Sequence, residues 1–386
     1  MNRHFLRDIA DIQTGPFGSQ LHKEDYVDIG TPIVTVEHLG NRVFTEQNLP
    51  KVSDEDKARL SKYVLKEGDI VFSRVGSVDR CSYVDAAHDG WMFSGRCLRV
   101  RPNTEVEPLY LYYFFCLEDT KQFVRNIAVG ATMPSINTKL LGEVEVAYPS
   151  QTEQQKIVAL LSALDDKIEI NQKINDNLQQ QAAALFANFY DQAETEVGFT
   201  EMIQILGGGT PKTGESSYWN GDIPFFTPKD VGFPYTLTTE KTITEEGLAH
   251  CNSRLYPINT VFVTARGTVG KVGLPGVPMA MNQSCFALVG KDTHQLLVYF
   301  YTLKAVDRLK HKASGAVFDA ITTRDFEAEN IMKLSDDDTK AFLDVAEPIY
   351  QAVLNNSIEN LRLSELRDSL LPKLMNGEID VTDIRL

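Results

Sequence analysis

The sequence predicts an α+β fold in which two similar domains, each mixing short strands with helices, are separated by two long helices that pair with each other. Three observations predict this pseudo-twofold internal repeat. Residues 153–192 carry apolar or small residues at heptad spacing, without a Gly or a Pro. The same spacing returns 185 residues later, since position 157 corresponds to position 342. Short motifs of the globular parts recur at nearly the same separation.

Residues 153–192 show the seam of a coiled coil. Steps of alternately four and three residues characterise such a seam, whereas a globular surface helix has a wider apolar stripe. A helix of roughly 36 residues is about 54 Å long, which exceeds a small domain, so this seam needs a partner. Its members are Ile157, Leu161, Leu164, Ile168, Asn171, Asn175, Leu178, Ala182, Leu185 and Phe189.

The partner seam is predicted in the same chain. Its members are Phe342, Ala346, Ile349, Val353, Asn356, Asn360, Leu363, Arg367, Leu370 and Leu374. Both seams carry two Asn at the same heptad places. A buried Asn lowers stability but fixes the register of a helix pair; the alternative is that these side chains face solvent. Antiparallel helices would place Asn171 near Asn360, and parallel helices would place it near Asn356.

Proline predicts irregularity in the second long helix. Pro372 is expected to kink or end the helix, because proline lacks the backbone N–H and its ring clashes with the preceding turn. Pro348, near the start, is a second candidate for a kink.

The globular parts supply the rest of the repeat. Residues 5–9 align with 199–203, and 126–138 align with 311–323. Clusters of β-branched and aromatic residues predict strands at 32–35, 68–77, 91–93, 99–101, 224–227 and 259–268. Aromatic-rich helices are predicted at 110–125 and 296–309. The predicted order is a first domain at 1–150, a long helix at 151–195, a second domain at 196–337, and a second long helix with a tail at 338–386.

Composition restricts the class of protein. The sequence contains no apolar run of about 20 residues and no signal-peptide core, so a cytoplasmic protein without a membrane span is expected. The five cysteines are scattered and suit reduced, mostly core positions, and no metal site is predicted. The net charge of −15 disfavours nucleic acid, but basic residues gather locally at 121–139 and 304–324.

Catalytic motifs are missing from the sequence. The loop at 207–214 is rich in Gly, but a phosphate-binding loop needs Gly immediately before its Lys, where Pro211 stands. No methyltransferase signature and no S-adenosylmethionine loop are found. We therefore predict no catalytic residues. An enzyme that binds nucleotide through this loop remains the alternative.

Two stretches resemble a known family. Residues 151–175 read QTEQQKIVALLSALDDKIEINQKIN, and residues 366–379 read LRDSLLPKLMNGEI. The first is similar to the central helical region, and the second to the C-terminal helical end, of type I restriction–modification specificity subunits. The resemblance covers the whole chain in order.

This resemblance implies a non-catalytic DNA-specificity subunit. It implies two target-recognition domains that each read half of a bipartite duplex site, and an antiparallel helix pair that sets their spacing and docks two methyltransferase subunits. Restriction or translocase subunits are further expected partners, and S-adenosylmethionine, ATP and magnesium would be bound by partner subunits. The alternative from a different class is a coiled-coil adaptor whose domains bind proteins.

Candidate DNA contacts follow from residue chemistry. Arg is the usual reader of guanine edges, and both Arg74 and Arg266 lie beside a Gly turn after a strand; an Arg held in a salt bridge is the alternative. Small and hydroxyl residues in loops near basic helices allow close approach to phosphates. The full set of candidates is Gly15, Ser19, Arg74, Ser77, Lys121, Arg125, Thr132, Asn137, Thr210, Lys212, Arg266, Thr268, Lys310, Lys312 and Thr322.

Overall fold

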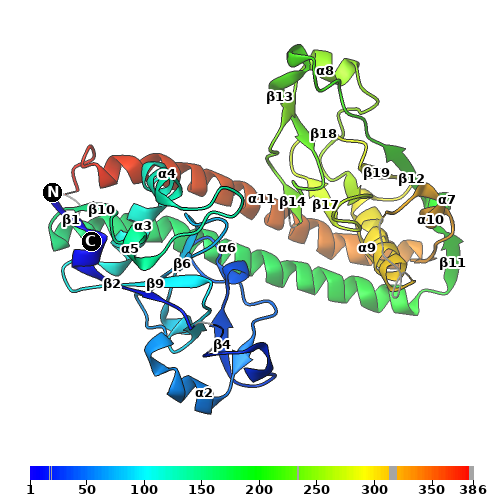
Figure 1. The fold of residues 1–386 in the computed structure, drawn as a ribbon. Helices are drawn as coiled ribbons and strands as arrows, with labels where there is room; N and C mark the ends of the chain where they lie inside the picture. The colour runs from blue at the N-terminus through cyan, green and yellow to red at the C-terminus, as the bar shows by residue number, and fades with distance from the viewer. Residues whose placement is uncertain (17, 19, 233, 313–319, 382–386) are drawn as a thin grey trace. The chain divides into compact units, whose positions relative to one another are not determined.

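A computed structural model describes residues 1–16, 18, 20–232, 234–312 and 320–381. The chain divides into two compact units (Figure 1). The first contains Met1–Asp165 and Glu365–Leu386, and the second contains Asp166–Ser364. The long helices α6 (Gln151–Gln192) and α11 (Asp336–Met375) each supply residues to both units.

The first unit is built on an antiparallel sheet in the order β2-β9-β6-β7. Alternate side chains of a strand point to opposite faces, so this sheet has a separate core on each side. Ile70 and Phe72 of β6 join the core beside helix α3 (Pro108–Cys116), whereas Val71 joins the other core. The strands are β2 (Ala10–Thr14), β6 (Ile70–Ser73), β7 (Cys81–Tyr83) and β9 (Cys97–Pro102).

A second sheet of the first unit runs in the order β3-β5-β4-β8. Its strands are β3 (Tyr26–Val27), β4 (Thr31–Val34), β5 (Lys51–Val52) and β8 (Met92–Phe93). β4 and β8 pair in parallel, and the backbone N–H of Ser94 then bonds to the carbonyl of Val34. Further elements of this unit are β1 (Asn2–Phe5), α1 (Leu6–Ile9), α2 (Asp54–Arg59), α5 (Thr138–Leu141) and β10 (Glu145–Tyr148).

The second unit repeats this plan. Its main sheet runs β12-β19-β16-β17-β14, and a smaller sheet runs β15-β13-β18. The strands are β12 (Ile203–Gly207), β13 (Trp219–Phe226), β14 (Tyr235–Thr236), β15 (Thr242–Ile243), β16 (Val261–Thr264), β17 (Val272–Pro275), β18 (Ala280–Met281) and β19 (Cys285–Gly290). The predicted internal repeat is therefore present.

Other elements of the second unit complete the correspondence. They are β11 (Thr195–Gly198), α7 (Phe199–Met202), α8 (Glu245–Ala249), α9 (Gln295–Lys312), α10 (Thr323–Glu327) and β20 (Asn330–Lys333). The terminal pair of β11 and β20 corresponds to β1 and β10 in the first unit, and both pairs are antiparallel.

The aromatic helix of the first unit differs from its prediction. Residues 110–125 do not form one helix, because α3 (Pro108–Cys116) and α4 (Glu118–Ile127) are separated at Leu117. Leu117 has a ψ of 134°, which ends the helical hydrogen-bonding pattern. The aromatic run itself lies in the core, as predicted, and Tyr110, Tyr113 and Phe115 are fully buried.

The long helices pair antiparallel within the second unit (Figure 1). The Asn171 amide donates to Asn360 Oδ1 over 2.8 Å, and the Asn356 amide donates to Asn175 Oδ1 over 2.8 Å. Asn171 and Asn175 are buried, so the solvent-facing alternative is wrong. Asn171 also donates to Glu359, which forms an ion pair with Lys167.

The buried stripe of α6 departs from the predicted heptads. In the second unit its buried positions advance by four, four, three, four and four residues, ending at Phe186 and Tyr190. The predicted Leu185 and Phe189 are half-buried at the edge of the same core. An α-helix drifts by about 20° per heptad from a 3.5-residue repeat, which moves burial one residue along. The same drift buries Tyr350 more deeply than the predicted Ile349.

The other predicted seam positions differ in how deeply they are buried. Ile157, Leu161 and Val353 are buried, whereas Leu164, Ile168, Leu178, Asn356, Asn360 and Leu363 are half-buried.

Pro372 does not end α11, which continues to Met375. Gly377, with a φ of +74°, then donates to Leu374, and Glu378 donates to Lys373. This glycine-dependent C-cap, rather than the proline, terminates the helix.

Replacing Asn171 and Asn360 together with leucine is expected to raise the melting temperature while loosening the register of the helices. The double change removes polar groups from the seam without leaving either amide unpaired. Calorimetry gives the melting temperature, and hydrogen exchange of amides 168–180 reports the register. A clear fall in the melting temperature would show that the two amides stabilise the pair.

Candidate nucleic-acid interface

Four loops of the first unit meet at one end of its main sheet, and we call them the first loop cluster. The Gly15 N–H donates to the Cys97 carbonyl over 3.2 Å, and the Arg74 N–H donates to the Arg96 carbonyl over 2.8 Å. The Gly76 N–H donates to the Pro134 carbonyl over 2.8 Å. The loops comprise residues 14–16, 74–77, 94–97 and 134–136.

The second unit contains an equivalent second loop cluster, made of residues 208–210, 265–268, 282–285 and 320–322. The Gly209 N–H donates to the Met281 carbonyl over 3.1 Å, and the Ala265 N–H donates to the Ser284 carbonyl over 2.8 Å. The Ile321 N–H bonds to the Ala265 carbonyl over 2.9 Å. Each unit thus presents the same construction of loops from distant parts of the sequence.

A close backbone contact requires glycine at matching places in the two clusters. A Cβ on Gly15 would lie 2.1 Å from the Ser94 carbonyl oxygen, and one on Gly208 would lie 2.1 Å from that of Asn282. Gly15 is therefore explained by packing within the cluster. Gly208 and Gly209 pack in the same way, and no helix follows them at 210–215. A phosphate-binding loop needs such a helix, so the nucleotide-binding alternative loses its structural basis.

The two predicted arginines occupy different places in their clusters. The Ile136 N–H bonds to the Arg74 carbonyl, whereas the Ile321 N–H bonds to that of Ala265, so Arg266 stands one residue beyond the position of Arg74. Arg74 is half-buried and its guanidinium donates to the Gly95 carbonyl over 3.0 Å. Arg266 is exposed, and its side chain has no hydrogen-bond or ion-pair partner among the described residues.

The small polar candidates divide into exposed residues and residues with structural bonds. Ser77 and Thr132 are exposed in the first cluster and its adjoining loop. Asn137 caps α5 by accepting from the Leu140 N–H, and Thr322 donates to Asp325 at the start of α10. Thr210 bonds to Gln283, and Thr268 bonds to the Pro228 carbonyl. Ser19 and residues 315–319 of the predicted loop 315–322 lie outside the described residues.

The basic candidates also differ in their surroundings. Arg125 donates to Asp79 and Glu118, both over 2.5 Å, and Lys312 forms an ion pair with the buried Glu329. The remaining lysines are Lys121 on α4, Lys310 beside Gly270, and the exposed Lys212. The structure therefore brings Arg74, Ser77 and Gly15 together, while two of the predicted cations have carboxylate partners.

Sequence reasoning missed the turn at 94–97 and its counterpart at 282–285. Arg96 in this turn is exposed, and its side chain has no partner within the parts of the chain that the structure describes. Cys97 and Cys285 mark the same position, because they pair with Ser73 and Thr264 across equivalent strands. Aligning the Phe-Ser-Gly-Arg-Cys stretch at 93–97 with the Met-Asn-Gln-Ser-Cys stretch at 281–285 would have revealed it.

Comparison with known proteins identifies the family of this repeated construction. The family model of the type I restriction modification DNA specificity domain matches residues 2–180 and again 195–333. The chain belongs to this family. Each match contains one loop cluster.

Relatives of the specificity family align over most of the chain. The type I restriction enzyme HindI specificity subunit of Haemophilus influenzae is 25% identical over 410 residues, covering 84% of this chain and 89% of that protein. The MjaIX specificity subunit of Methanocaldococcus jannaschii is 23% identical over 407 residues, covering 98% and 93%.

A solved structure shares the fold of this specificity-family chain. The S subunit of a type I restriction–modification system from M. genitalium superposes with a TM-score of 0.57 at 16% identity, covering 97% of this chain and 95% of that one. Within the described ranges, none of the helices has both the length and the apolar character needed to cross a bilayer.

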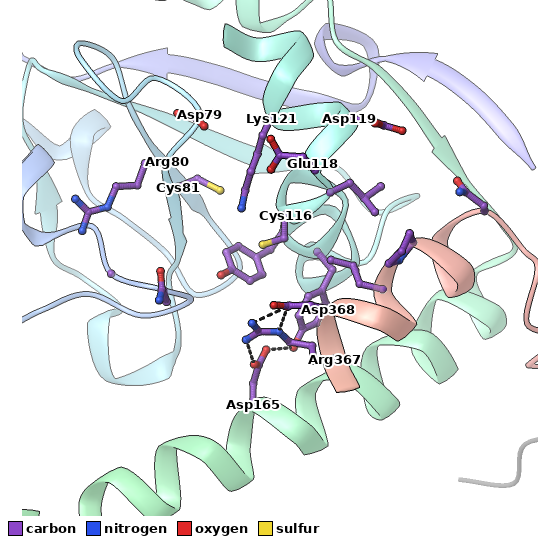
Figure 2. A pocket seen from close by; sticks show the side chains of 18 residues that line it. Asp79, Arg80, Cys81, Cys116, Glu118, Asp119, Lys121, Asp165, Arg367 and Asp368 are labelled. Atoms are coloured by element: carbon purple, nitrogen blue, oxygen red, sulfur yellow. Dashed lines mark hydrogen bonds and ion pairs between the residues drawn. The ribbon is translucent and has the colours of Figure 1, made fainter. Parts of the chain in front are cut away.

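A pocket of about 500 Å³ lies in the first unit of this specificity-family chain (Figure 2). Its carboxylates outnumber its cations, which disfavours a phosphate ligand. The acidic lining residues are Asp79, Glu118, Asp119, Asp165 and Asp368, and the basic ones are Arg80, Lys121 and Arg367.

An ion-pair network of Asp165, Arg367 and Asp368 lines one side of this pocket (Figure 2). Asp165 of α6 accepts from the Tyr113 hydroxyl over 2.6 Å and from Arg367 over 2.7 Å. Burial acts to lower the pKa of Arg367, but its bonds to Asp165 and Asp368 outweigh burial and raise that pKa. The network therefore joins α3, α6 and α11 as a structural contact.

Two thiols line the same pocket. Burial raises the pKa of both Cys81 and Cys116, so they are protonated near neutral pH. The thiolate is the reactive form of cysteine. These cysteines therefore do not form an activated nucleophile.

Proposed function

We propose that this chain is the DNA-specificity subunit of a type I restriction–modification enzyme, and that each loop cluster reads one half of a bipartite duplex target. The observation that carries the proposal is the repeated cluster, with equivalent backbone bonds and an exposed arginine in each unit. Backbone bonds hold the loops in place, and exposed Arg96 and Arg266 offer the bidentate donors that guanine edges accept.

The partners follow from the same assignment. We propose that two methyltransferase subunits dock on the helices, that restriction or translocase subunits join them, and that the assembly acts in the cytoplasm. S-adenosylmethionine, ATP and magnesium are then bound by these partner subunits. The helices are proposed to set the spacing of the half-sites, which is supported by the continuity of α6 and α11 from residues of one unit into residues of the other.

Single alanine variants of Arg96 and Arg266 test the DNA interface. Each variant is expected to weaken binding of the assembled methyltransferase complex to its target duplex by about tenfold to a hundredfold, because one bidentate base contact contributes about 1–3 kcal/mol. Fluorescence anisotropy measures the affinity. The probe is a duplex carrying the motif found by methylation-aware sequencing of cells that express this chain.

The matched control is Arg3→Ala on β1, an exposed arginine outside both clusters and outside the two long helices. It is expected to bind the target within about twofold of the parent, because it lacks a base contact in the proposal. Full affinity of both Arg96→Ala and Arg266→Ala would show that the clusters do not contact DNA. Loss of affinity in Arg3→Ala as well would indicate a general effect of charge.

A further inference from the structure

A loop that adjoins the first loop cluster exposes apolar side chains to solvent. Val129 is 63% exposed and Met133 is 66% exposed, and both lie in residues 128–135. Exposed apolar residues that occur singly are normal on protein surfaces. Val129 and Met133 are both exposed in one short loop beside a proposed interface, which indicates that a binding partner covers them.

Backbone bonds fix the shape of this loop. The Val129 N–H donates to the Ser135 carbonyl over 2.9 Å, and the Ser135 N–H donates to the Val129 carbonyl over 2.8 Å. The Ser135 hydroxyl also donates to the Val129 carbonyl. Gly130 has a φ of +112°, and a Cβ there would lie 2.6 Å from the Met133 carbonyl oxygen. Met133 is therefore presented at the tip of a closed turn.

The same loop is attached to the loop that carries Arg74. The Gly76 N–H bonds to the Pro134 carbonyl over 2.8 Å, and the Ile136 N–H bonds to the Arg74 carbonyl over 3.0 Å. Pro134 follows Met133 directly, so these bonds fix the base of its side chain relative to the cluster. Loop 128–135 is therefore anchored directly to loop 74–77, which carries the exposed Ser77.

The Met133 side chain at the tip of the loop is suited to contact bases rather than phosphates or sugars. Phosphates and sugars bind cations and hydrogen-bond donors, which the Met133 side chain lacks. Bases offer apolar faces and the thymine methyl group, and methionine is among the side chains that proteins place against base steps. The flexible thioether adapts to such irregular apolar surfaces.

We propose that Met133 makes an apolar contact with a base of the first half-site and thereby contributes to sequence specificity. This inference rests on the proposed function and assigns to the loop a role in base recognition besides approach to phosphates. Residues 313–319, at the corresponding place of the second repeat, lie outside the described residues and take no part in it.

The test compares two duplexes bound by the assembled methyltransferase complex. One carries the methylated motif, and the other has the same length and an unrelated sequence. Met133→Ala is expected to bind the motif duplex about tenfold more weakly, as expected for one lost base contact. Its affinity for the unrelated duplex should be unchanged, because non-specific binding is electrostatic. Met133→Leu, which keeps an apolar side chain, should retain most of the affinity.

The matched control is Ile29→Ala, which removes an apolar side chain that is 90% exposed. Ile29 precedes β4, and the first loop cluster lies beyond the other end of that strand. This variant should match the parent on both duplexes. Size-exclusion chromatography and thermal melting establish that every variant assembles and folds.

Three outcomes would overturn the proposal for Met133. They are full affinity of Met133→Ala for the motif duplex, an equal loss on both duplexes, and a failure of this variant alone to assemble, which would place a protein partner on the loop. Failure of the proposed function looks different. In that case the parent complex itself would bind both duplexes equally.

Discussion

Replacing Asp165 with alanine is expected to destabilise the first unit by about 1–3 kcal/mol, the usual cost of leaving a buried polar group without its hydrogen-bond partner. Asp165 is 5% exposed and accepts bonds from both Tyr113 and Arg367. Its removal leaves the buried Tyr113 hydroxyl without its acceptor, and the partly buried Arg367 guanidinium keeps only its ion pair with Asp368 among the described residues.

Calorimetry and native-state hydrogen exchange of the α3 amides measure this effect. Asp176→Ala, on an exposed position of the same helix, is the control and should change stability by less than about 0.5 kcal/mol. Replacing Asp165 with leucine and Arg367 with methionine together should recover part of the loss, because an apolar pair substitutes well for a buried ion pair while the Tyr113 hydroxyl stays without its acceptor. Equal stability of Asp165→Ala and the parent would show that the network contributes nothing.

Exchanging residues 1–150 for the corresponding domain of another specificity-family member is expected to change one half of the methylated motif completely. All loops of the first loop cluster lie within these residues, whereas the second cluster lies within 208–322. The second half of the motif should therefore stay the same. The gap between the halves should also stay the same, because the exchange retains α6 and α11.

The structure adds a condition to this exchange. The core of the first unit includes Ile157 and Leu161 of α6 and Leu371 of α11, so the incoming domain must keep the residues that contact them. Methylation-aware sequencing of cells carrying the exchanged chain reads the motif. A change in both halves, or in neither, would contradict independent reading by the two domains.

The helix pair and the repeat could be predicted because they depend on periodic patterns. Two polar interruptions at matching heptad places are a specific signal, and the bonds of Asn171 with Asn360 and of Asn356 with Asn175 confirm it. Which residues of α6 form the buried stripe was harder to predict from the sequence, because Phe186 and Leu185 are both apolar. The drift of a 3.6-residue helix against a 3.5-residue repeat decides between them.

The candidate interface was harder to predict because its residues are positioned by distant partners. Arg74 and Arg266 both precede a glycine turn, yet their offset of one residue gives Arg74 a carbonyl partner and leaves Arg266 exposed. Asn137 is used as a helix cap. Arg125 meets Asp79 across the fold. Residue type alone does not separate such structural bonds from a free side chain in a loop.

The first unit is closed by residues from the far end of the chain. Leu371, Leu374 and Met375 belong to its core, together with residues that precede Asp165. During synthesis at about 5–20 residues per second, the roughly 210 residues between Asp165 and Met375 take about 10–40 s to translate. Through that interval, the apolar surface that α11 later covers is open on the nascent chain. Completion of the first unit is therefore a late event on the ribosome, although its sequence emerges first.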